Sequence, residues 1–167
     1  MATNGHSVPA SHTHELAEDR SAAPQAMRVE ELSRLLNKLL EAERAGAKVL
    51  AAFLDDYERD TPAWRQLVAV QRDEATNCAI LIDLIQRVNG GEPSHETGDF
   101  FGKALAVQGK AARLRFLNRG QQWVARKISD AVPRVEQGFV RGALIAMQDS
   151  HLLNIEACDA LIQTLEA

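Results

Sequence analysis

The sequence predicts an all-α fold, and three observations carry that prediction. The chain has 167 residues, enough for one domain with a hydrophobic core. Its apolar share of 46% comes mainly from Leu, Ala, Val and Ile, with aromatic residues at only 5%, which favours helix over strand. Apolar side chains recur every three or four residues through four long segments, which is the spacing of one buried helix face. We therefore expect a single helical domain.

Residues 1–27 are predicted to form a disordered tail and residues 28–167 the folded domain. The tail is rich in Ala, Ser, Thr, His and Pro and has no apolar periodicity. We interpret its three histidines, His6, His12 and His14, as incidental residues of a solvated arm rather than as a metal site.

The first two helices are predicted to form a hairpin with a short turn. The first is expected over residues 29–57, where the apolar stripe is continuous. A capping residue, Thr61, followed by Pro62 at the first helical position predicts the start of the second helix. The run Asn89-Gly90-Gly91 predicts its end, because glycine is the common residue just past a helix.

The next connection is long enough to cross the bundle. Residues 90–99 are polar, and Asp99 is predicted to cap a short helix. A third long helix is expected after Gly109, and Pro133 is predicted to end it and to open the fourth. The expected architecture is a four-helix bundle of two antiparallel hairpins, joined by a crossover connection with a short extra helix.

Each of the four helices carries polar side chains on its apolar stripe near mid-length. Burying a carboxylate or an imidazole costs on the order of several kcal/mol unless a partner satisfies it. Because the middles of four antiparallel helices lie at a similar height, these side chains are predicted to converge on one buried site. They are Glu43 from the first helix, Glu74 and Asn77 from the second, Gln121 from the third, and Gln148 and His151 from the fourth.

This order of polar positions resembles that of the ferritin-like superfamily of di-iron carboxylate proteins, the class of rubrerythrin and bacterioferritin. In that superfamily one Glu comes from each of two helices and a Glu-x-x-His pair from each of the other two. The resemblance spans residues from about 29 to 166 and implies a ferritin-like four-helix bundle. More narrowly, four segments look like an uncharacterised bacterial ferritin-like domain family of unknown function: Glu41 to Gly46, Asp73 to Cys78, Leu117 to Gln121 with Trp123, and Ser150 to Ile155.

The residue types match the superfamily in part. The resemblance implies metal ligands at Glu43, Glu74 and His151. It also puts neutral amides, namely Asn77, Gln121 and Gln148, where the remaining ligands would be. Four carboxylates balance two divalent ions, whereas two balance one, so a second ion would stay uncompensated in the core. We therefore expect one divalent ion, Fe, Mn or Zn, or none, with the amides as weak or outer partners.

Two interpretations of this centre stay open at the level of sequence. With a redox metal, the resemblance implies oxygen or peroxide activation and so a metal-dependent oxidoreductase. Without one, the same side chains form a hydrogen-bonded network, and the protein is a non-catalytic binding or assembly module that retains the fold. A different rotation of the helices would turn Glu41, Asp73 or Asp149 inward instead.

Three further positions lie next to the predicted site. Cys78 is one helical turn beyond Glu74, where we expect a packing residue and keep a reactive thiol near the site as the alternative. Gly46 and Gly120 lie inside predicted helices, where glycine costs up to about 1 kcal/mol relative to alanine. Close helix contact is the interpretation that we favour for both, and a small polar cavity is the alternative.

Charge and composition exclude several classes of function. A net charge of −4 gives no global electrostatic case for binding nucleic acid or an anionic membrane. No segment approaches the roughly 20 apolar residues of a membrane span, and we expect a cytoplasmic protein. Four large aromatic side chains are more than one narrow bundle is expected to bury, which predicts a homodimer: Trp64, Trp123, Phe100 and Phe101. The sequence predicts no particular substrate.

Overall fold

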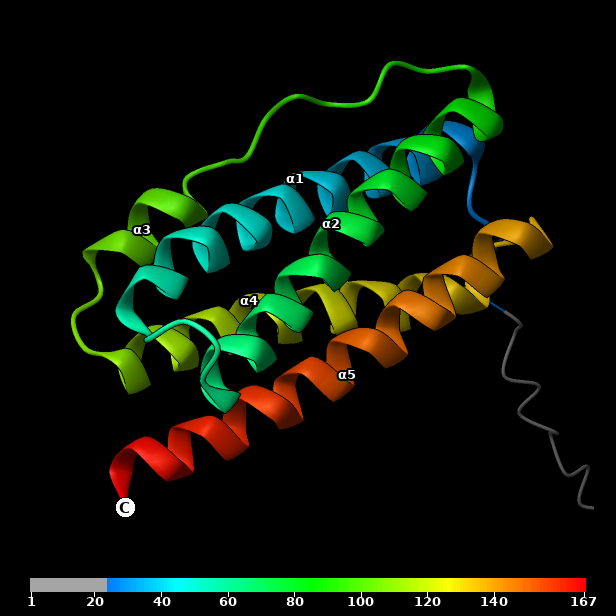
Figure 1. Cartoon of the computed structure of the whole chain (residues 1–167). Helices are drawn as coiled ribbons and strands as arrows, with labels where there is room; N and C mark the ends of the chain where they lie inside the picture. The colour runs from blue at the N-terminus through cyan, green and yellow to red at the C-terminus, as the bar shows by residue number, and fades with distance from the viewer. Residues whose placement is uncertain (1–23) are drawn as a thin grey trace, which may run out of the picture.

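Residues 24–167, the part of the chain that the computed structural model describes, fold into four long helices and one short helix (Figure 1). No β-strand occurs among these residues, so the prediction of an all-α fold is confirmed. The long helices are α1 (Val29–Phe53), α2 (Pro62–Asn89), α4 (Lys110–Ala131) and α5 (Gly138–Glu166), and the short one is α3 (Phe100–Ala106). Two 3₁₀ turns, η1 (Leu54–Asp56) and η2 (Val132–Arg134), follow α1 and α4.

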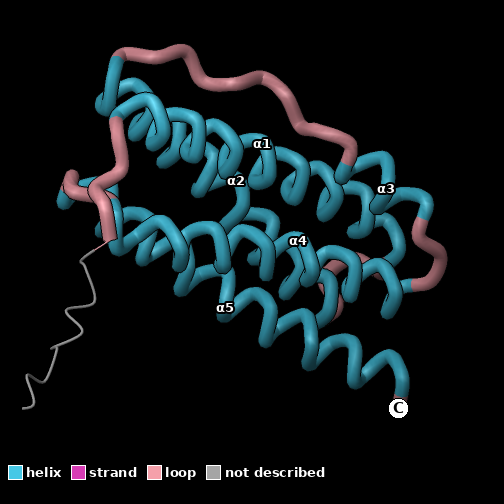
Figure 2. The backbone as a smooth tube through the Cα atoms, turned by 180° about the vertical axis from the view of Figure 1, so that it is seen from behind, coloured by secondary structure: helices cyan, strands magenta, loops and turns pink. Residues whose placement is uncertain are grey.

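The long helices form two antiparallel hairpins, α1 with α2 and α4 with α5 (Figure 1). Contacts within each hairpin are much more extensive than those between hairpins, where α1 meets α4 and α2 meets α5. Because α2 and α4 run in the same direction, the chain between them must return along the bundle. Figure 2 shows this crossover lying along α1 before it reaches α3. The predicted hairpins, crossover and short extra helix are therefore all present.

The start and the end of α2 follow the predicted local signals. The Oγ1 atom of Thr61 accepts a hydrogen bond from the backbone N–H of Trp64 at 3.3 Å, and Pro62 occupies the first helical position. Gly90 closes the helix with φ at 66°, a left-handed conformation that glycine adopts without a steric penalty.

Three other boundaries differ from the prediction. The α-helical part of α1 ends at Phe53, because η1 tightens the last turn before the extended Tyr57. Pro133 opens only the turn η2, since the next apolar residue, Val135, is extended and buried, and α5 starts after it. Asp99 makes no side-chain capping bond, and its carboxylate pairs instead with Lys103 at 2.5 Å.

The hydrophobic core is divided into two clusters with a polar layer between them. In every long helix the buried polar positions fall, along the chain, between residues of one cluster and residues of the other. The first cluster includes Leu36, Ile85, Ile128 and Leu144, and the second includes Phe53, Leu67, Leu114 and Cys158. The polar layer comprises Glu43, Glu74, Asn77, Asn118, Gln121, His151 and Asn154. The fold thus places these side chains at a common height in the bundle.

Of the predicted tail, residues 1–23, with His6, His12 and His14, lie outside the described residues. The last part of the tail contacts the bundle. Met27 is buried in the first apolar cluster, and its backbone N–H donates to the carbonyl of Arg134 at 2.8 Å. The folded domain therefore includes Met27.

The aromatic residues that predicted a homodimer are largely accommodated within one chain. Trp64, Phe100 and Phe101 are half-buried, and Trp123 is 38% exposed. The basic residues of α3 and α4 lie mainly at the surface, where several pair with carboxylates or rest on aromatic rings. Within residues 24–167 no helix is long and apolar enough to cross a membrane.

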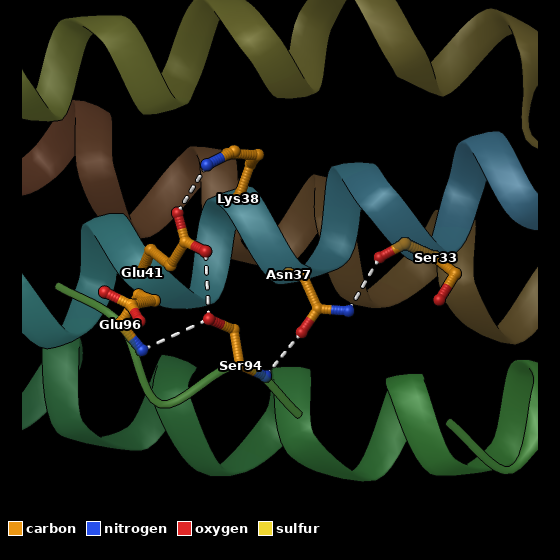
Figure 3. A network of polar contacts seen from close by, with 6 residues as sticks. All are labelled: Ser33, Asn37, Lys38, Glu41, Ser94 and Glu96. Carbon is orange, nitrogen blue, oxygen red and sulfur yellow. Dashed lines mark hydrogen bonds and ion pairs between the residues drawn. The ribbon is translucent and has the colours of Figure 1, made fainter. Parts of the chain in front are cut away.

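Ser94 fastens the crossover to α1 (Figure 3). Its backbone N–H donates to Oδ1 of Asn37 at 2.6 Å, and its hydroxyl donates to Oε1 of Glu41 at 2.9 Å. The other oxygen of Glu41 lies 2.7 Å from Nζ of Lys38. The hydrogen bond with Lys38, aided by that with Ser94, holds the pKa of Glu41 below its usual value, while burial opposes the shift. Glu41 therefore accepts from Ser94 as a carboxylate.

Asn37→Ala is expected to loosen the crossover without unfolding the bundle. The change leaves the N–H of Ser94 without its acceptor, a loss of about 1 kcal/mol for a part-buried hydrogen bond. Hydrogen exchange should accelerate in residues 92–98 and stay unchanged in α2. Arg87→Ala, which removes an exposed ion pair with Asp83 and a contact with the ring of Phe139 but no bond to Ser94, is the matched control. Unchanged exchange in residues 92–98 would contradict this role of Asn37.

Candidate functional site

Glu43, Glu74 and His151 meet in the polar layer, with exposed fractions of 0%, 3% and 1%. The Nε2 atom of His151 lies 2.7 Å from Oε1 of Glu43, and the side chain of Glu74 is hydrogen-bonded to Glu43 as well. The residues of the alternative helix rotation lie nearer the surface: Glu41 and Asp73 are half-buried and Asp149 is exposed.

Two of the three predicted amide partners belong to this layer. Asn77 donates from Nδ2 to Oε2 of Glu43 at 3.1 Å. Gln121 donates from Nε2 to Oδ1 of Asn118 at 3.1 Å. Gln148 is half-buried and donates instead to the backbone carbonyl of Ala125 at 3.3 Å. It was predicted beside His151, but the structure turns its side chain to the backbone of α4.

Sequence reasoning did not assign a role to Asn118. This residue is 4% exposed and links α4 to α5, because Nδ2 donates to the carbonyl of Ile155 at 3.2 Å and to Oδ1 of Asp159 at 2.8 Å. The available signal was its position three residues before Gln121, which puts the two on one helix face. Asn118 therefore holds Gln121 in place by accepting from its amide.

Glu74 is the proton-carrying acid of the cluster. Burial is the main cause that raises its pKa well above the usual value of 4.5, and the adjacent Glu43 raises it further. Glu74 therefore holds its proton to a higher pH than an ordinary carboxyl group and can donate it to Glu43. Glu43 contacts three side chains in this way, which are Glu74, His151 and Asn77.

Glu74→Gln is expected to change how stability depends on pH. Below pH 4.5 the folded and the unfolded state both hold the Glu74 proton, so its contribution is complete there. As the pH rises toward the raised pKa, only the unfolded state releases the proton, and stability is lost at up to about 1.4 kcal/mol per pH unit.

Glutamine does not titrate, so the unfolding free energy of the natural protein should fall relative to that of Glu74→Gln as the pH rises. Urea unfolding between about pH 4 and 8 measures this difference. Glu136→Gln on the exposed surface is the control. A difference that does not vary with pH would contradict the protonated state of Glu74.

Three buried polar atoms in the layer lack hydrogen-bond partners among residues 24–167. They are Nδ1 of His151, Oε1 of Gln121 and Nδ2 of Asn154. A buried polar group without a partner costs about 1–3 kcal/mol, so such groups call for an explanation. Nδ1 of His151 donates or accepts according to the tautomer and charge of the ring, whereas Oε1 of Gln121 is an acceptor in any case. Oε1 of Gln121 can therefore receive a hydrogen bond.

Gln121 and His151 line a cavity of about 540 Å³. The cavity lies between α1 and α4, and α3 and the end of the crossover border it. Glu74, Gln121 and His151 are its buried polar residues, which we call the floor. The walls are mainly apolar and include Ala42, Ala45, Phe100, Phe116, Leu117 and Val124. The rim carries Lys38, Glu41, Asp99, Lys103 and Arg119.

Both glycines that the sequence singled out line this cavity, and each also permits a close contact. A Cβ atom on Gly46 would lie 2.6 Å from Oε2 of Glu74. A Cβ atom on Gly120 would lie 2.6 Å from the ring of Phe100. Each glycine therefore gives room to a side chain from another helix. Each also lines the cavity that was the alternative interpretation of these two positions.

The cluster as arranged does not fit a metal ion. Within residues 24–167 no three His, Cys, Asp or Glu side chains stand so that they could hold one. The hydrogen bonds give a reason, since one oxygen of Glu43 faces His151 and the other accepts from Asn77. A metal bound by Glu43, Glu74 and His151 would have to replace these bonds.

Cys78 is a packing residue in this structure. It is half-buried and packs against the first apolar cluster. Burial, with the nearby carboxyl groups of Glu43 and Glu74, raises the pKa of Cys78 to about 12. Burial likewise raises the pKa of Cys158 to about 12. Both thiols are therefore protonated at neutral pH and are weak nucleophiles.

The fold and the site together define an all-helical protein with a buried acid–histidine cluster at the bottom of a cavity. The chain belongs to the family described as a domain of unknown function, DUF6306, whose model matches residues 30–160. The matched segment contains the floor residues and Glu43. No curated protein and no solved structure matches the chain.

Proposed function

We propose that this protein is a non-catalytic binding module that holds a small organic molecule in the cavity between α1 and α4. The observation that carries the proposal is an unpartnered buried acceptor, Oε1 of Gln121, on a floor residue of the cavity. A ligand with a hydrogen-bond donor would satisfy such an acceptor, and a purely apolar ligand would not.

The size and the lining of the cavity support this proposal. A volume of about 540 Å³ is within the range of small-molecule sites, which are mostly apolar with a few placed polar groups. The polar groups here are preorganised, because Glu43 binds His151 and Asn118 binds Gln121. A floor held in this way loses little freedom when a ligand arrives, which favours affinity.

The alternative is a ferritin-like protein with one divalent ion, Fe, Mn or Zn, at Glu43, Glu74 and His151, acting as a metal-dependent oxidoreductase. The meeting of two carboxyl groups and an imidazole supports it, and the mutual hydrogen bonds of Glu43 oppose it. Thermal unfolding with and without added Fe(II), Mn(II) or Zn(II) separates the two. A metal centre predicts that added metal raises the Tm of the natural protein and leaves the Tm of a Glu43→Gln, Glu74→Gln double variant unchanged.

Fluorescence of Trp123, which lines the cavity, provides the test of ligand binding. In a Trp64→Phe variant Trp123 is the remaining tryptophan, so its quenching reports on this site. The probe is naphthol, a neutral aromatic molecule with one hydroxyl donor. We expect saturable quenching that Ala42→Phe, which narrows the cavity, weakens at least about tenfold.

Ala79→Phe on the exposed face of α2 is the matched control and should leave the titration unchanged. An absence of saturable quenching would overturn the binding function, and so would equal effects of the two substitutions.

We also propose a homodimer, with α5 as its contact surface in place of the aromatic residues that first predicted it. Ile145, Leu152 and Leu153 are 42%, 47% and 65% exposed on this helix. Apolar side chains grouped on one face are typical of a protein contact. Light scattering should give a dimer for the natural chain and a monomer for Leu153→Glu. A monomeric natural chain would contradict this part of the proposal.

A further inference from the structure

We propose that the ligand of this cavity is an organic acid with an apolar, planar body, its carboxylate at the rim and a hydrogen-bond donor at the floor. This inference rests on the proposed binding function and concerns the class of ligand. It comes from the different chemistry of the floor, the walls and the rim.

The floor of the cavity favours a ligand with a hydrogen-bond donor. Oε1 of Gln121 is an acceptor without a partner among the described residues. A hydroxyl or amino group on the ligand would satisfy it, whereas a carboxylate there would face this acceptor and the buried carboxyl groups of Glu74 and Glu43. The acidic end of the ligand must therefore point outward.

The walls favour a flat apolar body. Phe100 and Phe116 stack with ring centroids 4.9 Å apart, and Gly120 lets Phe100 lie against α4. Leu117 and small alanine side chains complete this lining. Aromatic walls favour an aromatic or other planar group, since ring pairs add roughly 0.5–1.5 kcal/mol to the burial of area.

The rim has one cation more than it has anions, and the extra cation is an arginine. Lys38 lies 2.7 Å from Glu41, and Lys103 lies 2.5 Å from Asp99. The guanidinium of Arg119 lies 5.0 Å from the ring centroid of Phe116, and no salt bridge of Arg119 occurs within residues 24–167. A guanidinium with unused donors can bind a carboxylate through two parallel hydrogen bonds. Arg119 therefore selects an anionic group at the rim.

Three probes of one ring system separate the parts of this inference. Naphthol carries only the donor, naphthoate only the carboxylate, and hydroxynaphthoate both groups at opposite ends. Titrations of the Trp64→Phe variant, followed by Trp123 fluorescence, should rank hydroxynaphthoate first, at least about tenfold tighter than either single-group probe. Its binding should also weaken with salt, because the carboxylate meets a partly exposed charge.

Two substitutions test which side chain contacts each end of the probe. Arg119→Gln should weaken naphthoate and hydroxynaphthoate at least about tenfold and leave naphthol unchanged. Arg126→Gln, an exposed position on α4 away from the cavity, is the matched control and should change none of the three. Gln121→Leu should weaken the two probes with a hydroxyl and spare naphthoate.

The outcomes distinguish this inference from the function on which it rests. Equal binding of all three probes, each weakened by Ala42→Phe, would overturn the ligand class and leave the binding function standing. A loss with Arg126→Gln as large as that with Arg119→Gln would also overturn it, because it would assign the effect to general surface charge. Failure of every probe to bind would overturn both.

Discussion

Replacing Glu43 by alanine is expected to lower the free energy of unfolding by roughly 3–5 kcal/mol. Glu43 is 0% exposed and accepts from His151, Asn77 and Glu74. Its removal leaves those three donors unpaired inside the bundle and adds a cavity at the middle of α1. Chemical denaturation with circular dichroism detection measures the loss directly.

Glu43→Gln is the matched variant for this prediction. It keeps the shape of the side chain and one acceptor, so the expected loss is smaller, about 1–3 kcal/mol. If Glu43→Ala unfolded within about 1 kcal/mol of the natural protein, the three donors would not depend on Glu43, and the proposed hydrogen-bonded cluster would be wrong.

Alanine substitutions at two helical glycines are expected to act in opposite directions. Gly46→Ala puts a methyl group 2.6 Å from Oε2 of Glu74, and Glu74 can move only by giving up its bond to Glu43. The crowding should lower the unfolding free energy by roughly 1–3 kcal/mol. It should also weaken naphthol binding, because the displaced carboxyl group enters the floor of the cavity.

Gly142→Ala is the control, since nothing lies within 4 Å of a Cβ atom built there. It should raise the unfolding free energy by up to about 1 kcal/mol, the helix preference of alanine over glycine. Thermal unfolding of both variants tests the pair. A raised Tm for Gly46→Ala as well would show that the contact with Glu74 does not constrain position 46.

Periodicity predicted much of the polar layer because a buried polar residue is conspicuous on an apolar stripe. Glu43, Glu74 and His151 were placed together in this way, and their observed contacts follow from mid-length positions on antiparallel helices. Gln148 was misplaced because positions three and four residues after Leu144 both fit a period of 3.6. Met147 occupies the buried place, and Gln148 turns to the backbone of α4.

The cavity was foreseen only as an alternative because its walls come from segments far apart in the chain. Phe100 of α3 lies against Gly120 of α4, and no local pattern shows that an aromatic ring needs a glycine opposite it. The fastening of Ser94 to Asn37 joins residues 57 positions apart. Such contacts depend on where the crossover lies, which loop composition does not specify.

Metal content of the protein purified without a chelator tests most directly whether Glu43, Glu74 and His151 satisfy one another or serve as ligands. Elemental analysis of the natural chain, with the Glu43→Gln, Glu74→Gln double variant beside it, is the measurement. We expect only trace metal in both proteins. One Fe, Mn or Zn ion per chain in the natural protein, lost in the double variant, would contradict a metal-free floor and identify the cluster as a metal centre.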